Sequence, residues 1–182
     1  GRVGRGTLQR VVRPGASRVT AACAHYESPD RCGGCQLQHL SIDAQREAKR
    51  TIVRDSFRRI ARRDVELPVM HGGEPWRYRR SLTLAMRRAS DGTIRAGLRA
   101  FDDPEEVFEL HDCAITDERV LTAWREILAA AAHLPDGDRL RGTVRWAEDR
   151  PLFVLEGGRT WDDLDSFLQR TPALAAIWWH AE

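Results

Sequence analysis

Apolar residues recur at every third or fourth position in three stretches of the chain, which is the spacing of one face of an α-helix. The longest stretch predicts a helix over residues 42–63, with Ser41 as its N-cap. A second helix is predicted over residues 117–133, where Thr116 is the expected N-cap and residues such as Trp124 face a core. A short third helix is predicted over residues 161–169.

Alternation of apolar and polar residues predicts strands over residues 81–88 and 93–100, and an apolar run predicts a final strand near the end of the chain. The expected strands cover residues 81–88, 93–100, 107–110, 141–147, 152–156 and 173–179. Turn residues at 90–92 and 149–150 join four of them into two hairpins. The chain is therefore expected to be α+β, with a cysteine-rich loop plus helix followed by a mostly antiparallel α/β central domain.

Composition and charge narrow the class of protein. The chain has 182 residues, and its 42% hydrophobic and 31% charged residues are ordinary globular values, so a disordered chain is excluded. Its apolar runs are too short to span a bilayer, so a membrane protein is excluded, and no secretory signal is found. Because the chain begins at Gly1, we expect it to be a piece of a longer protein.

The net charge of +2 conceals an asymmetry. Residues 1–99 carry 21 basic and 9 acidic side chains, whereas residues 100–182 carry 8 and 18. A basic half of this size attracts a polyanion such as nucleic acid. Only Lys49 among the basic residues is not arginine, a bias that suits phosphate contacts but that a GC-rich genome also produces.

Two basic segments are candidate nucleic-acid contacts. One is a stripe at every fourth residue of the first predicted helix, formed by Arg46, Arg50, Arg54, Arg58 and Arg62. This stripe suits a phosphate backbone, although a solvated helix face is the better explanation of the stripe taken by itself. The other is the alternation over residues 76–80, Trp-Arg-Tyr-Arg-Arg, which suits unpaired bases and phosphates. Its alternative interpretation is the start of a strand with both aromatic rings in the core.

The four cysteines are Cys23, Cys32, Cys35 and Cys113. The pair at 32 and 35 encloses two glycines and can turn both sulfurs toward one point. Four thiolates suit either a zinc ion or an iron–sulfur cluster. A redox-active pair and inert thiols are the alternatives, whereas disulfides need an oxidising compartment that nothing here indicates. Four histidines near cysteines or glycines could act as ligands, but a surface position is expected for His25, His39, His71 and His111.

A run of nine residues, CGGCQLQHL over 32–40, follows Arg18-Val19 and Cys23 and precedes Gln45 and Lys49. Together with Trp-Arg-Tyr-Arg over 76–79 and Leu-His-Asp-Cys over 110–113, it resembles the iron–sulfur RNA (uracil-5-)-methyltransferases. That family includes the 23S rRNA 5-methyluridine methyltransferases. The chain departs from the family in one spacing: eight residues, 24–31, separate the first two cysteines where members commonly have five.

The resemblance implies a [4Fe-4S] cluster on Cys23, Cys32, Cys35 and Cys113. It also implies RNA recognition, for which the expected contacts are Arg77, Tyr78, Arg79, Arg80, Arg50 and Arg54. Residues 1–19 resemble the end of a TRAM-like β module, residues 20–63 the cluster segment with its basic helix, and residues 64–182 the central RNA-binding domain. S-adenosylmethionine, the cysteine nucleophile and the general base belong to a C-terminal methyltransferase domain that follows these segments in the family. We therefore assign no catalytic and no S-adenosylmethionine-binding residue to this chain.

We expect the parent protein to be an RNA (uracil-5-)-methyltransferase acting on 23S rRNA, with this chain as its cluster-bearing part. The alternative is a stand-alone, metal-stabilised RNA-binding module without catalysis. The expected partner is RNA, specifically rRNA, without any membrane, and the expected state is a cytoplasmic monomer.

Overall fold

The computed structural model describes residue 6 and residues 8–27 and 29–182. The chain forms two compact units. The first unit consists of Gly1–Ala21 and Gln36–His71, and the second of Ala22–Cys35 and Gly72–Glu182. The predicted TRAM-like segment falls partly outside the described residues, and its described part takes part in one isolated bridge, between Arg18 and Leu40. The domain boundaries predicted after residues 19 and 63 stay a prediction.

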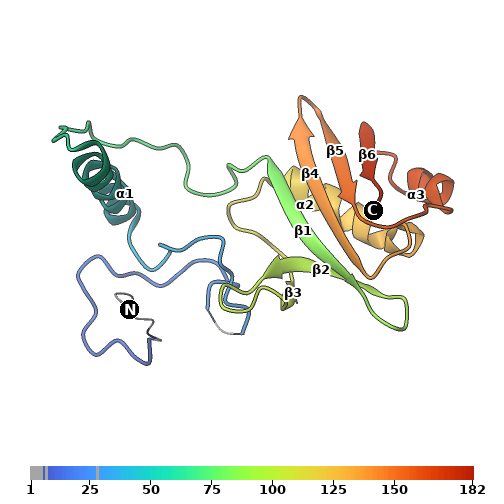
Figure 1. Ribbon diagram of the computed structural model, residues 1–182, viewed down its shortest axis with the longest axis horizontal. Coiled ribbons are helices and arrows are strands. Elements are labelled where there is room, and N and C mark those ends of the chain that lie inside the picture. The colour runs from blue at the N-terminus through green and yellow to red at the C-terminus, as the bar shows by residue number, and fades with distance from the viewer. Residues whose placement is uncertain (1–5, 7, 28) are drawn as a thin grey trace. The chain divides into compact units, whose positions relative to one another are not determined.

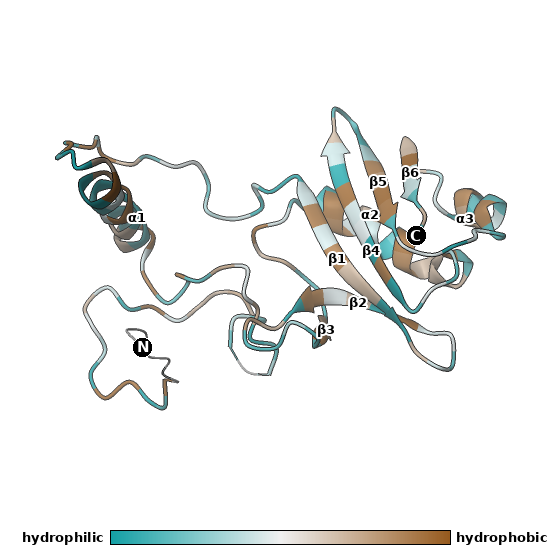
Figure 2. Ribbon diagram, viewed as in Figure 1, coloured by the Kyte–Doolittle hydropathy of each residue, from teal (hydrophilic) through white to brown (hydrophobic). Residues whose placement is uncertain are grey.

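The first unit contains the long basic helix. Helix α1, Ile42–Ser56, continues as a π-helical turn, η1, Phe57–Ala61, and ends at Arg62 in the left-handed conformation. As predicted, the Ser41 hydroxyl caps the helix by accepting a hydrogen bond from the Ala44 N–H at 3.4 Å. No residue of α1 is buried, and its apolar face (Figure 2) includes Ile52, which is 60% exposed. The helical prediction is confirmed, but within the described residues its apolar face covers no core.

The second unit is built on a six-stranded sheet with the order β3-β2-β1-β4-β5-β6 (Figure 1). The strands are β1 Ser81–Arg88, β2 Ile94–Arg99, β3 Val107–Glu109, β4 Arg139–Ala147, β5 Arg150–Glu156 and β6 Ala176–His180. All neighbouring pairs are antiparallel except β5 and β6. The α+β class and both predicted hairpins are confirmed. Strands β5 and β6 are parallel because the connection between them contains a short helix, Leu164–Arg170. This connection brings the chain back to the end of the sheet at which β5 begins.

Two helices cover one face of this sheet and leave the other open. They are α2, Glu118–Ala129, followed by a 3₁₀ turn, η2, Ala131–His133, and α3, Leu164–Arg170. The core lies between the helices and the sheet, where Phe153 contacts Trp124 edge-on and stacks on Phe167. Alternation along the strands, visible in Figure 2, therefore places every second residue on the open face.

The second helix begins one residue later than the sequence predicts. Asp117, not Thr116, is its N-cap, because the Asp117 carboxylate accepts a hydrogen bond from the Arg119 N–H at 3.0 Å. The Arg119 guanidinium binds the same carboxylate and holds the pKa of Asp117 near 2. Thr116 is instead fully buried. Both residue types are good caps, so local sequence does not decide between them.

Among the described residues, no helix combines the length and apolar character needed to cross a membrane.

Candidate functional site

All four cysteines lie in the second unit, and all four side chains are partly buried. Three of them belong to the loop over residues 22–35, which folds back on itself through backbone hydrogen bonds. The Tyr26 N–H donates to the Cys23 carbonyl at 3.1 Å, and the Cys32 N–H donates to the His25 carbonyl at 2.8 Å. The second of these bonds joins residues near the two ends of the spacer that separates Cys23 from Cys32.

The cysteine loop is held against the hairpin of β2 and β3. Cys32 forms an antiparallel bridge with Ala100, and the Phe101 N–H donates to the Arg31 carbonyl at 3.0 Å. The Arg31 guanidinium forms ion pairs with Asp102 at 2.9 Å and with Glu106 at 3.2 Å. This docking connects two segments that are about 70 residues apart in the chain.

His25 belongs to the same loop and is buried, whereas the sequence suggests a surface position. Its ring stacks on Phe108 of β3 with centroids 5.4 Å apart. Its Nδ1 lies 2.6 Å from the Asp30 carboxylate. His25 therefore contributes packing to the loop.

Cys113 follows β3 and is positioned by Arg77. The Arg77 guanidinium makes a bidentate ion pair with Asp112, at 2.7 and 3.0 Å, and also donates to the Cys113 carbonyl at 3.0 Å. The Arg77 backbone has a φ of 55° and donates to the Ala114 carbonyl. The ion pair lowers the pKa of Asp112. Arg77 thus ties residues 76–80 to the segment that carries Cys113.

The thiols affect one another electrostatically. Burial raises the pKa of Cys32, and the negative charges of Cys23, Cys35 and Cys113 raise it further, against a lowering by the Gly34 amide. All three other thiols are thus close enough to Cys32 to influence its ionisation. Within the described part of the chain, however, no three His, Cys, Asp or Glu side chains gather tightly enough to hold a single metal ion.

The other predicted RNA contacts are distributed over both units. In the second unit Tyr78 is 59% exposed, Arg79 and Arg80 are exposed, and Arg79 bridges Thr116 through its backbone. In the first unit Arg50 donates to the Leu67 carbonyl and to Glu47. Neighbouring stripe residues likewise pair with carboxylates three positions earlier, as Arg46 does with Asp43 and Arg58 with Asp55. The stripe is therefore partly neutralised, and the RNA contacts stay predictions.

The sequence did not reveal two residues that position the cysteine segments, Arg31 and Asp112. Each directly precedes a cysteine, and only their long-range contacts reveal what they do.

Replacing Arg77 by alanine is expected to lower the free energy of unfolding by about 1–2 kcal/mol at neutral pH. Much of the ion pair is solvent-screened, since the Arg77 side chain is 43% exposed, but the carbonyl contacts are lost as well. Because Arg77 lowers the pKa of Asp112, the ion pair stabilises the fold above the unfolded-state pKa, about 3.9. The difference between wild type and variant should shrink as the pH falls through the lowered folded-state pKa.

Urea unfolding at pH 7 and at pH 3 measures this difference. Arg79→Ala is the matched control, since the Arg79 side chain forms no ion pair with any described residue. Equal stability of Arg77→Ala and wild type at pH 7 would contradict the positioning role.

Three relatives found by comparison with known proteins are all named as RNA methyltransferases. No model of a known protein family matches the chain. The chain is 39% identical over 113 residues, 59% of its length, to the 23S rRNA (uracil(1939)-C(5))-methyltransferase RlmD of Halomonas elongata. It is 36% identical over 129 residues, 68% of its length, to the protein of that name from Dechloromonas aromatica. It is 32% identical over 167 residues, 89% of its length, to an uncharacterized RNA methyltransferase of Listeria innocua. The matched parts make up 22%, 29% and 35% of these three relatives.

Proposed function

This chain is a homologue of 23S rRNA (uracil-C5)-methyltransferases and related RNA methyltransferases, and we propose that it forms the cluster-bearing, RNA-recognising part of such an enzyme. The substrate is a uridine of 23S rRNA, and the methyl donor is S-adenosylmethionine. The donor site and the nucleophile lie elsewhere in the parent protein, since the relatives are about three to five times longer than the matched part. An rRNA substrate makes the cytoplasm the site of action.

The single observation that carries the cluster proposal is that all four cysteines belong to one compact unit, three in its loop and one after β3. The charges of Cys23, Cys35 and Cys113 each raise the pKa of Cys32. Cys23 and Cys35 belong to the same loop as Cys32, whereas Cys113 follows strand β3. A cluster takes one thiolate on each of four irons, so its ligands surround it and need not converge on one point, as the ligands of a single ion do. Four thiolates are the ligand set of a [4Fe-4S] cluster, and this chemistry is what supports the proposal.

The cluster would supply four iron–thiolate bonds that cross-link the loop to the segment after β3. The chain's own residues already prepare this connection. Arg31 and the Cys32 bridge hold the loop to the hairpin, and Arg77 holds the segment of Cys113. Burial raises the pKa of Cys32, and the hydrogen bond from the Gly34 backbone opposes this rise only in part.

Tyr78, Arg79 and Arg80 are the residues that we propose contact RNA beside this centre. The tyrosine ring and both guanidinium groups are exposed on a segment that Arg77 fixes in place. An exposed aromatic ring stacks on an unpaired base, and adjacent arginines bind its phosphates. Arg50 and Arg54 would add phosphate contacts from the first unit.

The test measures binding of fluorescently labelled single-stranded RNA from the uridine-rich part of 23S rRNA by the anaerobically purified chain. The double variant Arg79→Ala/Arg80→Ala should weaken binding by about tenfold or more at moderate salt and should reduce its salt dependence. Arg125→Ala on α2, where the guanidinium is already paired with Glu118, is the matched control. Absence of RNA binding by the wild type would refute the proposal, and RNA binding with zinc in place of iron would favour a metal-stabilised binding module.

A further inference from the structure

The open face of the sheet carries a row of arginines that the sequence does not bring together. Arg87 of β1 is paired in register with Arg95 of β2 on one side and with Arg139 of β4 on the other. Like charges directly opposite on neighbouring strands repel each other. Arg99, further along β2, adds a fourth positive charge that also acts on Arg87.

Arg87 is the least satisfied of these side chains. Its Nη1 donates to the Met86 carbonyl at 3.1 Å, but its Nη2 is buried and has no hydrogen-bond partner among the described residues. Burial lowers the pKa of Arg87, and repulsion from Arg139 and Arg99 lowers it further. A guanidinium stays protonated at physiological pH, so this arrangement holds a buried charged donor without an acceptor, which is costly.

Carboxylates compensate only part of the charge. Glu105 pairs with Arg139 at 3.2 Å, and Glu156 makes a bidentate pair with Arg141 at 2.9 and 3.0 Å. Within the part of the chain that the structure describes, neither Arg87 nor Arg99 forms an ion pair. Arg99 donates to the Pro104 carbonyl instead. Among the described residues, the positive charge that no ion pair compensates is therefore carried by Arg87, Arg95 and Arg99.

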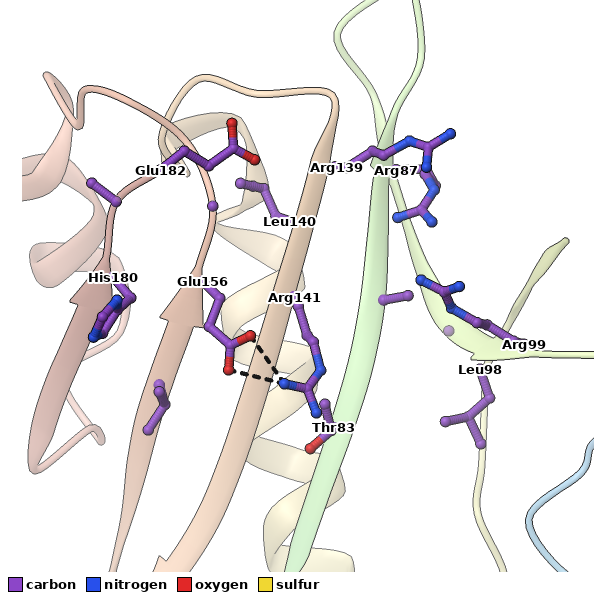
Figure 3. Close-up of a pocket in the computed structure, with 15 residues that line it drawn as sticks. Thr83, Arg87, Leu98, Arg99, Arg139, Leu140, Arg141, Glu156, His180 and Glu182 are labelled. Carbon is purple, nitrogen blue, oxygen red and sulfur yellow. Dashed lines mark hydrogen bonds and ion pairs between the residues drawn. The ribbon is translucent and has the colours of Figure 1, made fainter. Parts of the chain in front are cut away.

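Arg87, Arg99 and Arg139 border a hollow of about 830 Å³ on the open face of the sheet. Figure 3 shows Arg87, Arg99 and Arg139 at one end of it, whereas the Arg141–Glu156 pair lies nearer the middle. The hollow is large enough for a nucleotide-sized group. At its arginine-rich end, the guanidinium N–H donors outnumber the protein oxygens that accept hydrogen bonds from them. Phosphate oxygens match a guanidinium in charge and in planar geometry.

We propose that Arg87, Arg99 and Arg139 form a binding site for a phosphate group on the open face of the sheet. Resting on the proposed function, we take this group to be an RNA backbone phosphate. Arg87 lies seven positions after Arg80 along β1, so a strand of RNA that contacts both spans roughly 20 Å, or a few nucleotides. The site extends RNA recognition from residues 78–80 onto the sheet.

The experiment compares wild type with Arg87→Gln/Arg99→Gln, using a fluorescein-labelled, uridine-rich single-stranded RNA of about ten nucleotides. Losing this one phosphate site should raise Kd by about tenfold and lower the slope of log K against log salt by about 0.7. Arg125→Gln, on the helix that covers the other face, is the control and should change neither. Unchanged affinity and slope in the double variant would overturn this inference while leaving the proposed function intact, whereas a wild type that binds no RNA would refute the proposed function itself.

Two further measurements separate the alternatives. Arg87→Gln alone should unfold at the same or a higher temperature without RNA, because it removes a repelling charge; a lower melting temperature would assign Arg87 a structural role. Inorganic phosphate is compared with chloride at equal ionic strength. If phosphate stabilises wild type but not the double variant, and RNA affinity is the same in both, then the site takes a free anion and the RNA assignment is wrong.

Discussion

Gly97→Ala is expected to lower the free energy of unfolding by about 3 kcal/mol or more. A Cβ atom at this position would overlap the carbonyl oxygen of Phe108 and lie 2.7 Å from its carbonyl carbon. Both atoms belong to the backbone of β3, which cannot move aside without breaking its pairing with β2. Because the cysteine loop docks on this hairpin through the bridge of Cys32 with Ala100, the variant should also lose iron.

Chemical unfolding and iron analysis of the purified variant test this expectation. Gly73→Ala is the matched control, since a Cβ there has no atom within 4 Å, and its stability should stay within about 0.5 kcal/mol of wild type. If Gly97→Ala were as stable as Gly73→Ala and retained its iron, the close approach of β2 and β3 would not be needed for the centre.

Cys32→Ser should reduce bound iron from about four atoms per chain to less than one. A serine hydroxyl does not ionise as a thiol does, so one iron loses its ligand, and Cys32 is the thiol on which the other three act. The loss should also lower the melting temperature, because metal–thiolate bonds stabilise only the folded state. Iron and sulfide analysis, together with visible absorption of anaerobically purified protein, measures the effect.

Ala24→Ser, at an exposed position in the same loop, introduces a serine without removing a thiol and should keep its iron. Cys113→Ser should behave like Cys32→Ser although it lies 81 residues away in the chain. Iron retained by both cysteine variants, or zinc in the wild type, would show that the four thiols do not hold an iron–sulfur cluster.

The local signals in the sequence predicted most of the secondary structure. The sequence identified both hairpins of the sheet, and the helical repeat with Ser41 identified α1 together with its continuation η1 to within two residues of the end of η1. Errors occurred where neighbouring residues offer equivalent chemistry, as with Thr116 and Asp117 at the start of α2. A cap depends on a single hydrogen bond, and its partner is chosen by the packing of the helix.

The site was less predictable than the fold. The cysteines and the segment over residues 76–80 stood out in the sequence, but all the contacts that connect them are long-range. Arg77 was predicted as an RNA contact, and in the structure its guanidinium is occupied by Asp112 and by two backbone carbonyls. A side chain of this type suits either role, so composition and spacing do not separate them.

By itself the sequence determined the α+β class, the strands and helices, the four thiols and the kinship with RNA methyltransferases, because these depend on local periodicity and on short motifs. Only the tertiary structure decided where the cysteine loop docks, what Arg77 holds, and that Arg95, Arg87 and Arg139 stand in one row. Alternation tells which residues share one face of a strand. The register between strands, and the face that the helices cover, follow instead from packing of the whole core, and these place distant charges side by side.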